Sequence, residues 1–331
     1  LSQPFQLQQE LVYVSASLGI AVFPDDATEL DDLLKNADQA MYGAKSAGRG
    51  CYHYFTESMR ASIQNRITLI NDLRNAIARG ELHLVYQPIF ELTGQKVDKA
   101  EALLRWHHPE RGNISPADFI PLAEESGLIV DIGNWVFEQA ARQAKQWRRQ
   151  FADNFQISIN TSPLQYRSNT DSPADWLAWL AKQQLDADAL TLEITENLLM
   201  NDYENVNRRL AQLRRSGMEI SIDDFGTGYS SLSYLKKFHI DYLKIDKSFV
   251  QKMTKDSDDL IICEAMVVMA NKLGIKVIAE GIETTEQMQL LKDMGCRYGQ
   301  GYWLAKPLAV EQFENLLLCA DREKNNRACP D

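Results

Sequence analysis

From residue 81 onward the chain alternates between apolar strand patterns and helical stripes, and this alternation constrains the fold more than any other feature. Eight strand candidates end near Phe90, Trp106, Thr161, Thr195, Asp224, Asp246, Gly281 and Gly301. Helical stripes separate most of them, at 133–149, 173–184, 202–216, 229–238, 257–273, 284–294 and 308–318. Strands that alternate with helices form parallel sheets, so eight of them predict an α/β fold of the TIM-like (β/α)8 barrel type.

The connection between the first two strand candidates departs from this pattern. Residues 83–90 and 97–106 are joined only by ELTGQK, whereas a parallel crossover needs a dozen or more residues. We therefore expect a hairpin, with the first barrel strand antiparallel to the second. The longest gap, 107–154, has room for two helices, and the first should begin at Pro116 with Ser115 as its N-cap.

A smaller pattern precedes the barrel. Residues 12–23 alternate as a strand, 30–44 carry a helical stripe and 51–55 form a short aromatic strand. This β-α-β piece is too small to bury a core alone, so we interpret it as the end of a truncated domain. Because the chain begins with Leu1 rather than Met, we expect it to be part of a longer protein.

These patterns predict four segments along the chain. They are a small α/β fragment at 1–56, a linker helix at 57–80, the barrel at 81–321 and a polar tail at 322–331.

Charge and composition exclude several classes of protein. The 331 residues include 35 Lys and Arg against 46 Asp and Glu, a net charge of −11. A binder of nucleic-acid polymers or anionic membranes needs a basic face instead. No apolar run spans a bilayer, the N-terminus lacks a signal-peptide pattern, and five scattered cysteines without a CxxC spacing favour a reduced compartment. We expect a cytoplasmic location without membrane contact for this segment. Whether the full protein has an upstream sensor or a membrane region is not determined by these residues.

Polar residues occur at the ends of successive strand candidates, where barrel enzymes place their chemistry. They are Glu101, Asn160, Glu193, Asp223, Asp224, Lys244, Glu280 and Gln300. Carboxylates gathered without partners repel one another and are costly to desolvate, and divalent cations remove that cost. Oxygen ligands without cysteine or histidine favour Mg²⁺ or Mn²⁺, and two such ions clamp the attacking and leaving oxygens of a phosphoryl displacement.

Residues next to these strand ends leave alternatives open. The segment 223–232, with two glycines, is either a plain connector or a gate that orders before the metal ligands engage, and Glu196 is placed to hold it. Arg105 is either a phosphate clamp or part of an exterior ion pair. His107 and His108 are better explained as loop residues than as ligands.

The same residues lie in longer segments that resemble the EAL-domain phosphodiesterases, which hydrolyse cyclic di-GMP. The resemblance covers about 62–320 in the order of that family. The matching segments are YQPI (86–89), EALLRW (101–106), RWHHPERGNISPADFIPLAEESGLI (105–129), NTS (160–162), EITE (193–196), DDFGTGYSSL (223–232), KIDKSFV (244–250), AEGIE (279–283) and GQGYWLAKP (299–307).

The resemblance implies roles for individual residues. The metal shell would be Glu101, Asn160, Glu193, Asp223 and Asp224, and it would hold two Mg²⁺ or Mn²⁺ ions. Lys244 would hold the catalytic water and Glu280 would be the general base. Gln87 and Arg105 would contact the dinucleotide, with Gln300 beside them supporting the metal–water shell, and Glu196 and Glu283 would be loop-anchoring acids.

The N-terminal segment 1–56 resembles the end of a GGDEF, diguanylate cyclase-type domain. The resemblance rests on ASLGIAVFPDDA (16–27) and LLKNADQAMYGAKSAGRG (33–50). No GGDEF-like loop occurs in these residues, so the resemblance assigns no cyclase activity to them.

The main hypothesis is a metal-dependent hydrolase that opens one phosphodiester bond of cyclic di-GMP to give linear pGpG and so lowers the level of a bacterial second messenger. One alternative is a cyclic di-GMP receptor that binds without useful turnover. Another is an enolase-like barrel, which also combines strand-end carboxylates with a lysine. The resemblance further implies a homodimer that forms through the helices next to the 223–232 loop.

Overall fold

The computed structural model describes residues 4–7, 10–94, 96–166, 172–196, 198, 203–227 and 239–326. The chain divides into two compact units, Leu1–Asn75 and Ala76–Asp331. Within the described residues, the helices are all too short or too polar to cross a lipid bilayer.

The first unit contains two small sheets and a helix. Its elements are β1 (Phe5–Leu7), β2 (Glu10–Val12), β3 (Leu18–Ile20), α1 (Leu30–Ser46) and β4 (Tyr52–Tyr54), followed by α2 (Glu57–Ala76). β1 pairs antiparallel with β2, and β3 pairs in parallel with β4. Helix α1 crosses between the parallel strands and packs closely on β3, since a Cβ at Gly19 would collide with the backbone of Ala37.

The expected single strand over 12–23 is wrong, because the chain forms β2 and β3 with irregular residues between them. A strand extends only as far as its partner, and β4 offers three residues to β3. The expected helix and the short aromatic strand match α1 and β4.

The second unit is a closed barrel of eight strands. They are β5 (Leu82–Glu91), β6 (Val97–His108), β8 (Gln156–Asn160), β9 (Leu190–Thr195), β10 (Glu219–Phe225), β11 (Tyr242–Ile245), β12 (Lys276–Ala279) and β13 (Tyr298–Gly299). β5 runs antiparallel to both of its neighbours, β6 and β13, and the other neighbouring pairs are parallel. The TIM-like barrel with an antiparallel first strand is therefore confirmed.

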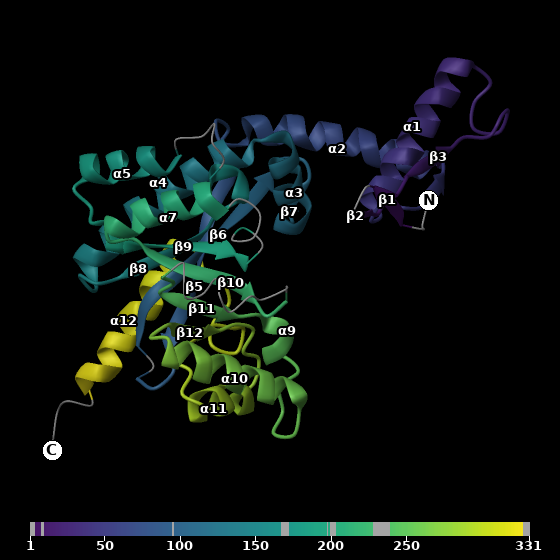
Figure 1. Cartoon of the computed structure of the whole chain (residues 1–331). Helices are drawn as coiled ribbons and strands as arrows, with labels where there is room; N and C mark the ends of the chain where they lie inside the picture. The colour runs from purple at the N-terminus through teal and green to yellow at the C-terminus, as the bar shows by residue number, and fades with distance from the viewer. Residues whose placement is uncertain are drawn as a thin grey trace. The chain divides into compact units, whose positions relative to one another are not determined.

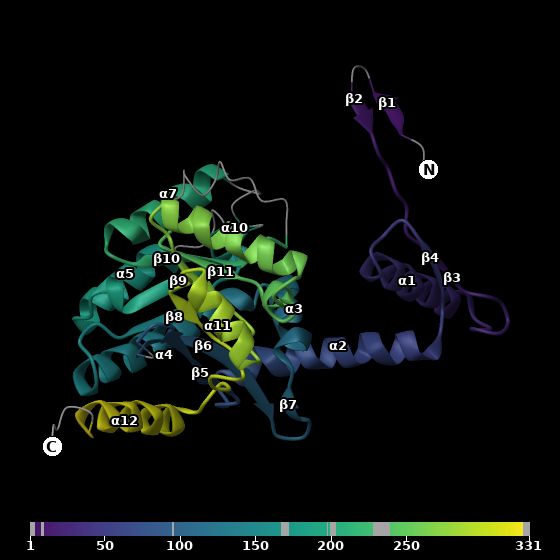
Figure 2. The ribbon, with the colours of Figure 1, turned by 90° about the horizontal axis from the view of Figure 1, so that it is seen from below.

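Helices surround these strands, as the two views in Figures 1 and 2 show together. They are α3 (Pro116–Ser126), α4 (Ile129–Gln150), α5 (Ser172–Gln183), α7 (Tyr203–Arg215), α9 (Lys247–Val250), α10 (Asp258–Lys272), α11 (Thr285–Asp293) and α12 (Val310–Asn326). Strand β7 (Gly112–Ile114) folds back on β6, and 3-10 turns lie at Pro163–Tyr166 and Ala187–Ala189.

The long gap after β6 holds two helices, as expected. The side chain of Ser115 accepts a hydrogen bond from the Ala117 backbone N–H at 3.3 Å and caps α3. The helix expected over 229–238 lies outside the described residues.

Alternate residues of each strand point into the barrel. In the middle of the interior, Ile89, Tyr242, Ile278 and Tyr298 form an apolar cluster. This layer separates a polar cluster at the start of the parallel strands from another at their ends.

The polar cluster at the strand starts surrounds Glu219. Its carboxylate accepts a hydrogen bond from Gln156 at 2.6 Å and lies 3.7 Å from the Lys99 ammonium and 3.4 Å from that of Lys276. The Lys99 ammonium also lies 4.4 Å from the centre of the Tyr242 ring. Burial raises the pKa of Glu219, but the two lysines outweigh burial and hold this pKa below its ordinary value.

We expect Glu219→Gln to lower the free energy of unfolding of the barrel by about 2 kcal/mol at pH 7, because buried Lys99 loses its counter-charge. A carboxyl group with a lowered pKa stabilises the fold above its ordinary pKa of 4.5, and this contribution disappears as the pH falls through the lower folded-state pKa. The difference in the free energy of unfolding between the variant and the wild type should therefore narrow as the pH falls from 4.5 through the folded-state pKa of Glu219.

Urea unfolding followed by tryptophan fluorescence measures this effect, since all six tryptophans lie in the barrel unit. The matched control is Glu138→Gln on the exposed face of α4, with an expected change below about 0.5 kcal/mol. A deficit for Glu219→Gln that stays as large as at pH 7 down to the lowest pH at which the wild type is folded would contradict the assigned role.

Candidate active site

The inward-facing side chains near the ends of the parallel strands meet in one polar cluster. Strand register sets the neighbours: Asn160 on β8 lies opposite Glu193 on β9, and Glu101 on β6 lies opposite Gln87 on β5. The barrel thus gathers residues that are far apart in the sequence.

Lys244 on β11 is the centre of this cluster and is almost completely buried, with 1% of its surface exposed. Its ammonium lies 2.6 Å from Glu193, 2.6 Å from Glu280, 3.3 Å from Glu101 and 3.3 Å from Asp223. Burial lowers the pKa of this lysine, but the four carboxylates outweigh burial and raise it above its ordinary value. Lys244 is therefore a permanent cation at neutral pH.

Amide side chains hold Glu101 in one orientation. Asn160 donates to one carboxylate oxygen of Glu101 at 2.7 Å, and Gln300 donates to the other at 2.6 Å. Gln300 also donates to Gln87 at 3.0 Å, and Gln87 donates in turn to the Ala305 carbonyl at 3.0 Å. These bonds link β5, β6, β8 and the residue that follows β13 around a single carboxylate.

The three glutamates next to Lys244 differ in proton affinity. Burial raises the pKa of Glu101, but Lys244 and the amide donors outweigh it, so this pKa lies below its ordinary value. Burial and the nearby charge of Glu101 raise the pKa of Glu193. Burial also raises the pKa of Glu280, to about 7. Glu280 is thus the carboxylate placed to exchange a proton near neutral pH.

A second acidic group adjoins the first at the end of β10. Carboxylate oxygens of Asp223, Asp224 and Glu280 lie within 4.8 Å of one another. Asp224 adopts a left-handed backbone conformation with φ of 53°, and its N–H donates to the Asp223 carboxylate at 3.0 Å. Burial and the charge of Asp223 raise the pKa of Asp224. Such strain is common at functional sites.

Asp246 belongs beside this group, although the sequence analysis did not include it. Its side chain is hydrogen-bonded with Asp224 and also accepts from the Ser248 N–H at 3.0 Å, where it caps α9. The sequence spacing indicates this position, because Asp246 follows Lys244 by two residues and alternate residues of an extended segment face the same side.

The donor set fits hard divalent cations. The Oε1 atom of Glu193 is buried and has no hydrogen-bond partner among the residues that the structure describes. Carboxylate and amide oxygens are the ligands of Mg²⁺ and Mn²⁺, and the acids here outnumber the single buried lysine. The oxygen donors expected as ligands are Glu101, Asn160, Glu193, Asp223 and Asp224.

The cluster opens into a cavity of about 280 Å³. The expected residues Gln87, Glu101, Asp223, Lys244, Glu280, Glu283 and Gln300 line it, together with Lys247, Gln251 and Tyr302, which the sequence analysis did not single out. A second cavity of about 290 Å³ lies between β6 and helices α3 and α4, with a lining that is mainly apolar. Leu103 borders both cavities.

Arg105 and Glu283 are hydrogen-bonded to residues outside the Lys244 cluster. Arg105 borders the second cavity, where its guanidinium donates to the Leu104 carbonyl at 2.8 Å. Glu283 accepts from Gln251 at 2.7 Å. Glu196 directly follows β9 and is half-buried, but residues 228–232 of the segment it was expected to hold lie outside the described residues.

The two histidines are the last residues of β6 and lie in the hairpin that it forms with β7. His107 is hydrogen-bonded to Asn113 at 2.8 Å, and His108 accepts from the Glu110 N–H at 3.2 Å. The loop expected for both residues is wrong, because β7 pairs with His107 and His108 and so extends β6 through them. Neither contact involves a residue of the Lys244 cluster.

Two family models match the chain. The EAL domain model matches residues 70–307, and the diguanylate cyclase, GGDEF domain model matches residues 1–51.

Similar proteins include the bifunctional diguanylate cyclase/cyclic di-GMP phosphodiesterase MucR of Pseudomonas aeruginosa, which is 43% identical over 315 residues. That match covers 95% of this chain and 46% of MucR. The cyclic di-GMP phosphodiesterase PdeR of Escherichia coli is 37% identical over 314 residues, covering 95% of this chain and 47% of PdeR. The chain thus spans about half the length of these relatives or less.

Solved structures share the fold. The MucR phosphodiesterase in its c-di-GMP complex superposes with a TM-score of 0.71 and 41% identity, covering 74% of this chain and 99% of that chain. The EAL enzyme Bd1971 in its cGMP-bound form superposes with a TM-score of 0.74 and 34% identity, covering 88% of this chain and 77% of that chain.

We expect Lys244→Met to lower the free energy of unfolding of the barrel by about 3–5 kcal/mol in EDTA, because four carboxylates lose their shared counter-charge. Magnesium ions at millimolar concentration should restore more stability to this variant than to the wild type, since they supply the missing positive charge. Tryptophan fluorescence during urea unfolding, with EDTA or with Mg²⁺, measures both effects.

The control for this experiment is Lys252→Met, which removes an exposed lysine outside the cluster. It should change stability by less than about 0.5 kcal/mol in either solution. A Lys244→Met variant whose stability does not respond to Mg²⁺ would show that the acids do not bind a divalent cation.

Proposed function

The chain belongs to the EAL domain family, and from this we propose that it is a phosphodiesterase that hydrolyses one phosphodiester bond of cyclic di-GMP to linear pGpG. The observation that carries the proposal is the Lys244 ammonium, which lies 2.6 Å from Glu280 and borders the 280 Å³ cavity. The names of MucR and PdeR as cyclic di-GMP phosphodiesterases support the choice of substrate.

The two cavities suit the two kinds of group in a cyclic dinucleotide. The cavity above Lys244 is lined by charged and amide side chains, which suits a phosphodiester. The cavity beside α3 and α4 includes Ile120, Ile129 and Val136, which suits the flat face of a base. Leu103 lies on the border between them, and Gln87 and Arg105 are the proposed dinucleotide contacts, one on each side.

In the proposed reaction, Glu280 accepts a proton from water as the water oxygen bonds to phosphorus. The phosphorus–O3′ bond breaks, the 3′ oxygen takes up a proton from solvent, and the product keeps a 5′-phosphate. Lys244 donates hydrogen bonds and holds the carboxylates and the attacking oxygen in place. Glu101, Asn160, Glu193, Asp223 and Asp224 would hold two Mg²⁺ or Mn²⁺ ions, which when bound neutralise charge on the phosphoryl group. Gln300 keeps Glu101 oriented through its 2.6 Å hydrogen bond.

The family match leaves no support for the enolase-like alternative. Binding of cyclic di-GMP without turnover is the competing outcome. Turnover is favoured because the site combines a carboxylate whose pKa burial raises to about 7 with a lysine held 2.6 Å away.

The proposed organisation keeps the four segments expected from the sequence: a GGDEF remnant at 1–56, a linker helix at 57–80, the EAL barrel at 81–321 and a tail at 322–331. The matches at 1–51 and 70–307 support the two named domains.

The proposed homodimer uses the helices next to the 223–232 loop. Among the described residues, α10 supports it with an outward apolar face, on which Ile261 is 66% exposed and Val268 is 50% exposed. Residues one helical turn or two apart share a face, so Ile261 and Val268 form one stripe.

We expect Glu280→Gln to reduce kcat about 1,000-fold, since the amide cannot accept the proton from water. The affinity for cyclic di-GMP should stay within about threefold of wild type, because the amide keeps the size of the carboxyl group. Chromatographic separation of pGpG from substrate in Mn²⁺ measures kcat, and calorimetry measures the affinity.

Glu138→Gln is the matched control, because it makes the same chemical change on the surface of α4. Near wild-type turnover in Glu280→Gln would remove Glu280 from the mechanism. A wild-type protein that binds cyclic di-GMP but yields no pGpG would favour the receptor alternative.

We expect Ile261→Glu to shift the protein toward the monomer, because a charge on the α10 stripe opposes burial of that face. Sedimentation velocity over a hundredfold range of concentration measures the distribution of species. Leu318→Glu, at a 47% exposed position on α12, is the control and should leave the distribution unchanged. A wild-type protein that sediments as a monomer throughout would exclude the proposed dimer.

A further inference from the structure

Lys247 is a second lysine on the wall of the 280 Å³ cavity and has no part in the reaction described above. We propose that its ammonium binds the reacting phosphate of the substrate and then the terminal phosphate of the linear product. This inference rests on the proposed function, because it names a further contact for the same substrate.

The backbone of Lys247 is held firmly beside the proposed base. The preceding residue, Asp246, caps α9 through the Ser248 N–H at 3.0 Å. On the other side, Gly281 approaches so closely that a Cβ there would lie 2.5 Å from the Lys247 Cβ and 3.1 Å from its Cα. Since Gly281 directly follows Glu280, the Lys247 side chain starts next to the residue that would take the proton from water.

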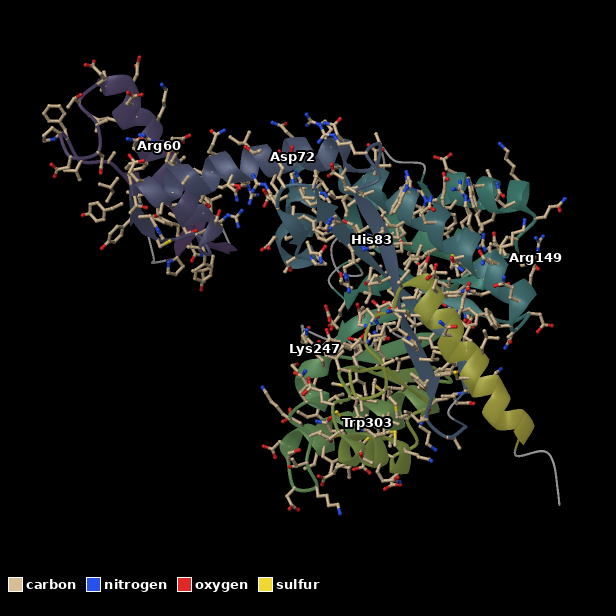
Figure 3. All side chains as sticks on the ribbon, turned by 180° about the vertical axis from the view of Figure 1, so that it is seen from behind. Arg60, Asp72, His83, Arg149, Lys247 and Trp303 are labelled. Carbon is tan, nitrogen blue, oxygen red and sulfur yellow. The ribbon has the colours of Figure 1, made fainter. Side chains whose placement is uncertain are left out.

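The ammonium of Lys247 can bind an anion in the cavity, whereas that of Lys244 is already paired with carboxylates. Lys244 is buried and already contacts four carboxylates. Lys247 is exposed, and although its charge helps to lower the pKa of the adjacent Asp246, its ammonium forms no ion pair within 4.0 Å in the described part of the chain. Figure 3 labels Lys247 at α9 on the ribbon of the barrel unit. An anion that enters this cavity therefore meets Lys247 as the exposed cation among the described lining residues.

The location of Lys247 selects the phosphate that it contacts. Arg105 borders the second cavity, beyond Leu103, and Lys247 borders the first, next to Glu280. The phosphate nearest Lys247 is therefore the one attacked by water. A phosphodiester carries one negative charge, while the terminal phosphate of pGpG carries up to two, so an ammonium at this place favours the product over the substrate.

Steady-state hydrolysis of cyclic di-GMP and its inhibition by added pGpG test the inference with Lys247→Gln, Lys247→Arg and the control Lys252→Gln. We expect Lys247→Gln to raise KM about tenfold, as for the loss of one hydrogen bond to a charged group, and to raise the inhibition constant of pGpG by a larger factor. Lys247→Arg should restore both values to within about threefold of wild type, and Lys252→Gln should match wild type. Tryptophan fluorescence during urea unfolding checks that each variant folds.

Two results would overturn the inference. One is a Lys247→Gln variant whose KM and pGpG inhibition both stay within twofold of wild type. The other is a Lys247→Arg variant as impaired as Lys247→Gln, which would indicate a packing role instead of a charge role.

The same variants separate this inference from the proposed function. If the wild type binds cyclic di-GMP without turnover, the proposed function fails, and the dissociation constants of pGpG for wild type and Lys247→Gln then decide the role of Lys247. If the wild type binds neither nucleotide, both proposals fail.

Discussion

The ammonium of Lys244 is buried in the barrel within 3.3 Å of four carboxylates, and the arrangement of the other polar side chains depends on it. A buried charge is tolerated only when it is paired and hydrogen-bonded. One lysine cannot balance Glu101, Glu193, Asp223 and Glu280, so the amides of Asn160 and Gln300 share in holding Glu101. The remaining negative charge at this end of the barrel is the feature that supports the proposed divalent cations.

The two ends of the barrel interior use similar residues with opposite results. At the strand starts, Glu219 is balanced by Lys99 and Lys276, and the apolar layer around Tyr242 covers the cluster. At the strand ends, acids exceed lysines and a cavity opens above them. A cluster in which opposite charges are paired stabilises the fold. A cluster with excess negative charge is destabilised by repulsion between its carboxylates, and a bound cation would relieve that repulsion.

Much of the fold follows from short-range features of the sequence. The six residues between the first two strands are too few for a parallel crossover, and β5 does run antiparallel to β6. Ser115 before Pro116 starts α3 as its side chain predicts. The strand expected over 12–23 fails because strand length depends on a partner, and β4 pairs with three residues only. Asp246 and Lys247 follow the end of β11, where strand periodicity alone no longer assigns a residue to the site, and only the close approach of Gly281 places Lys247 beside the cavity.

Periodicity and loop length are local properties, so the order of strands and helices, the antiparallel first strand and the set of polar residues at the strand ends could be read from the amino-acid order. The closed barrel was needed to show which carboxylates share Lys244, why Glu280 holds its proton more tightly than Glu101, and that Arg105 and Lys247 border different cavities. Those properties depend on burial and on distances between residues far apart in the chain, and both quantities exist only once the barrel has closed.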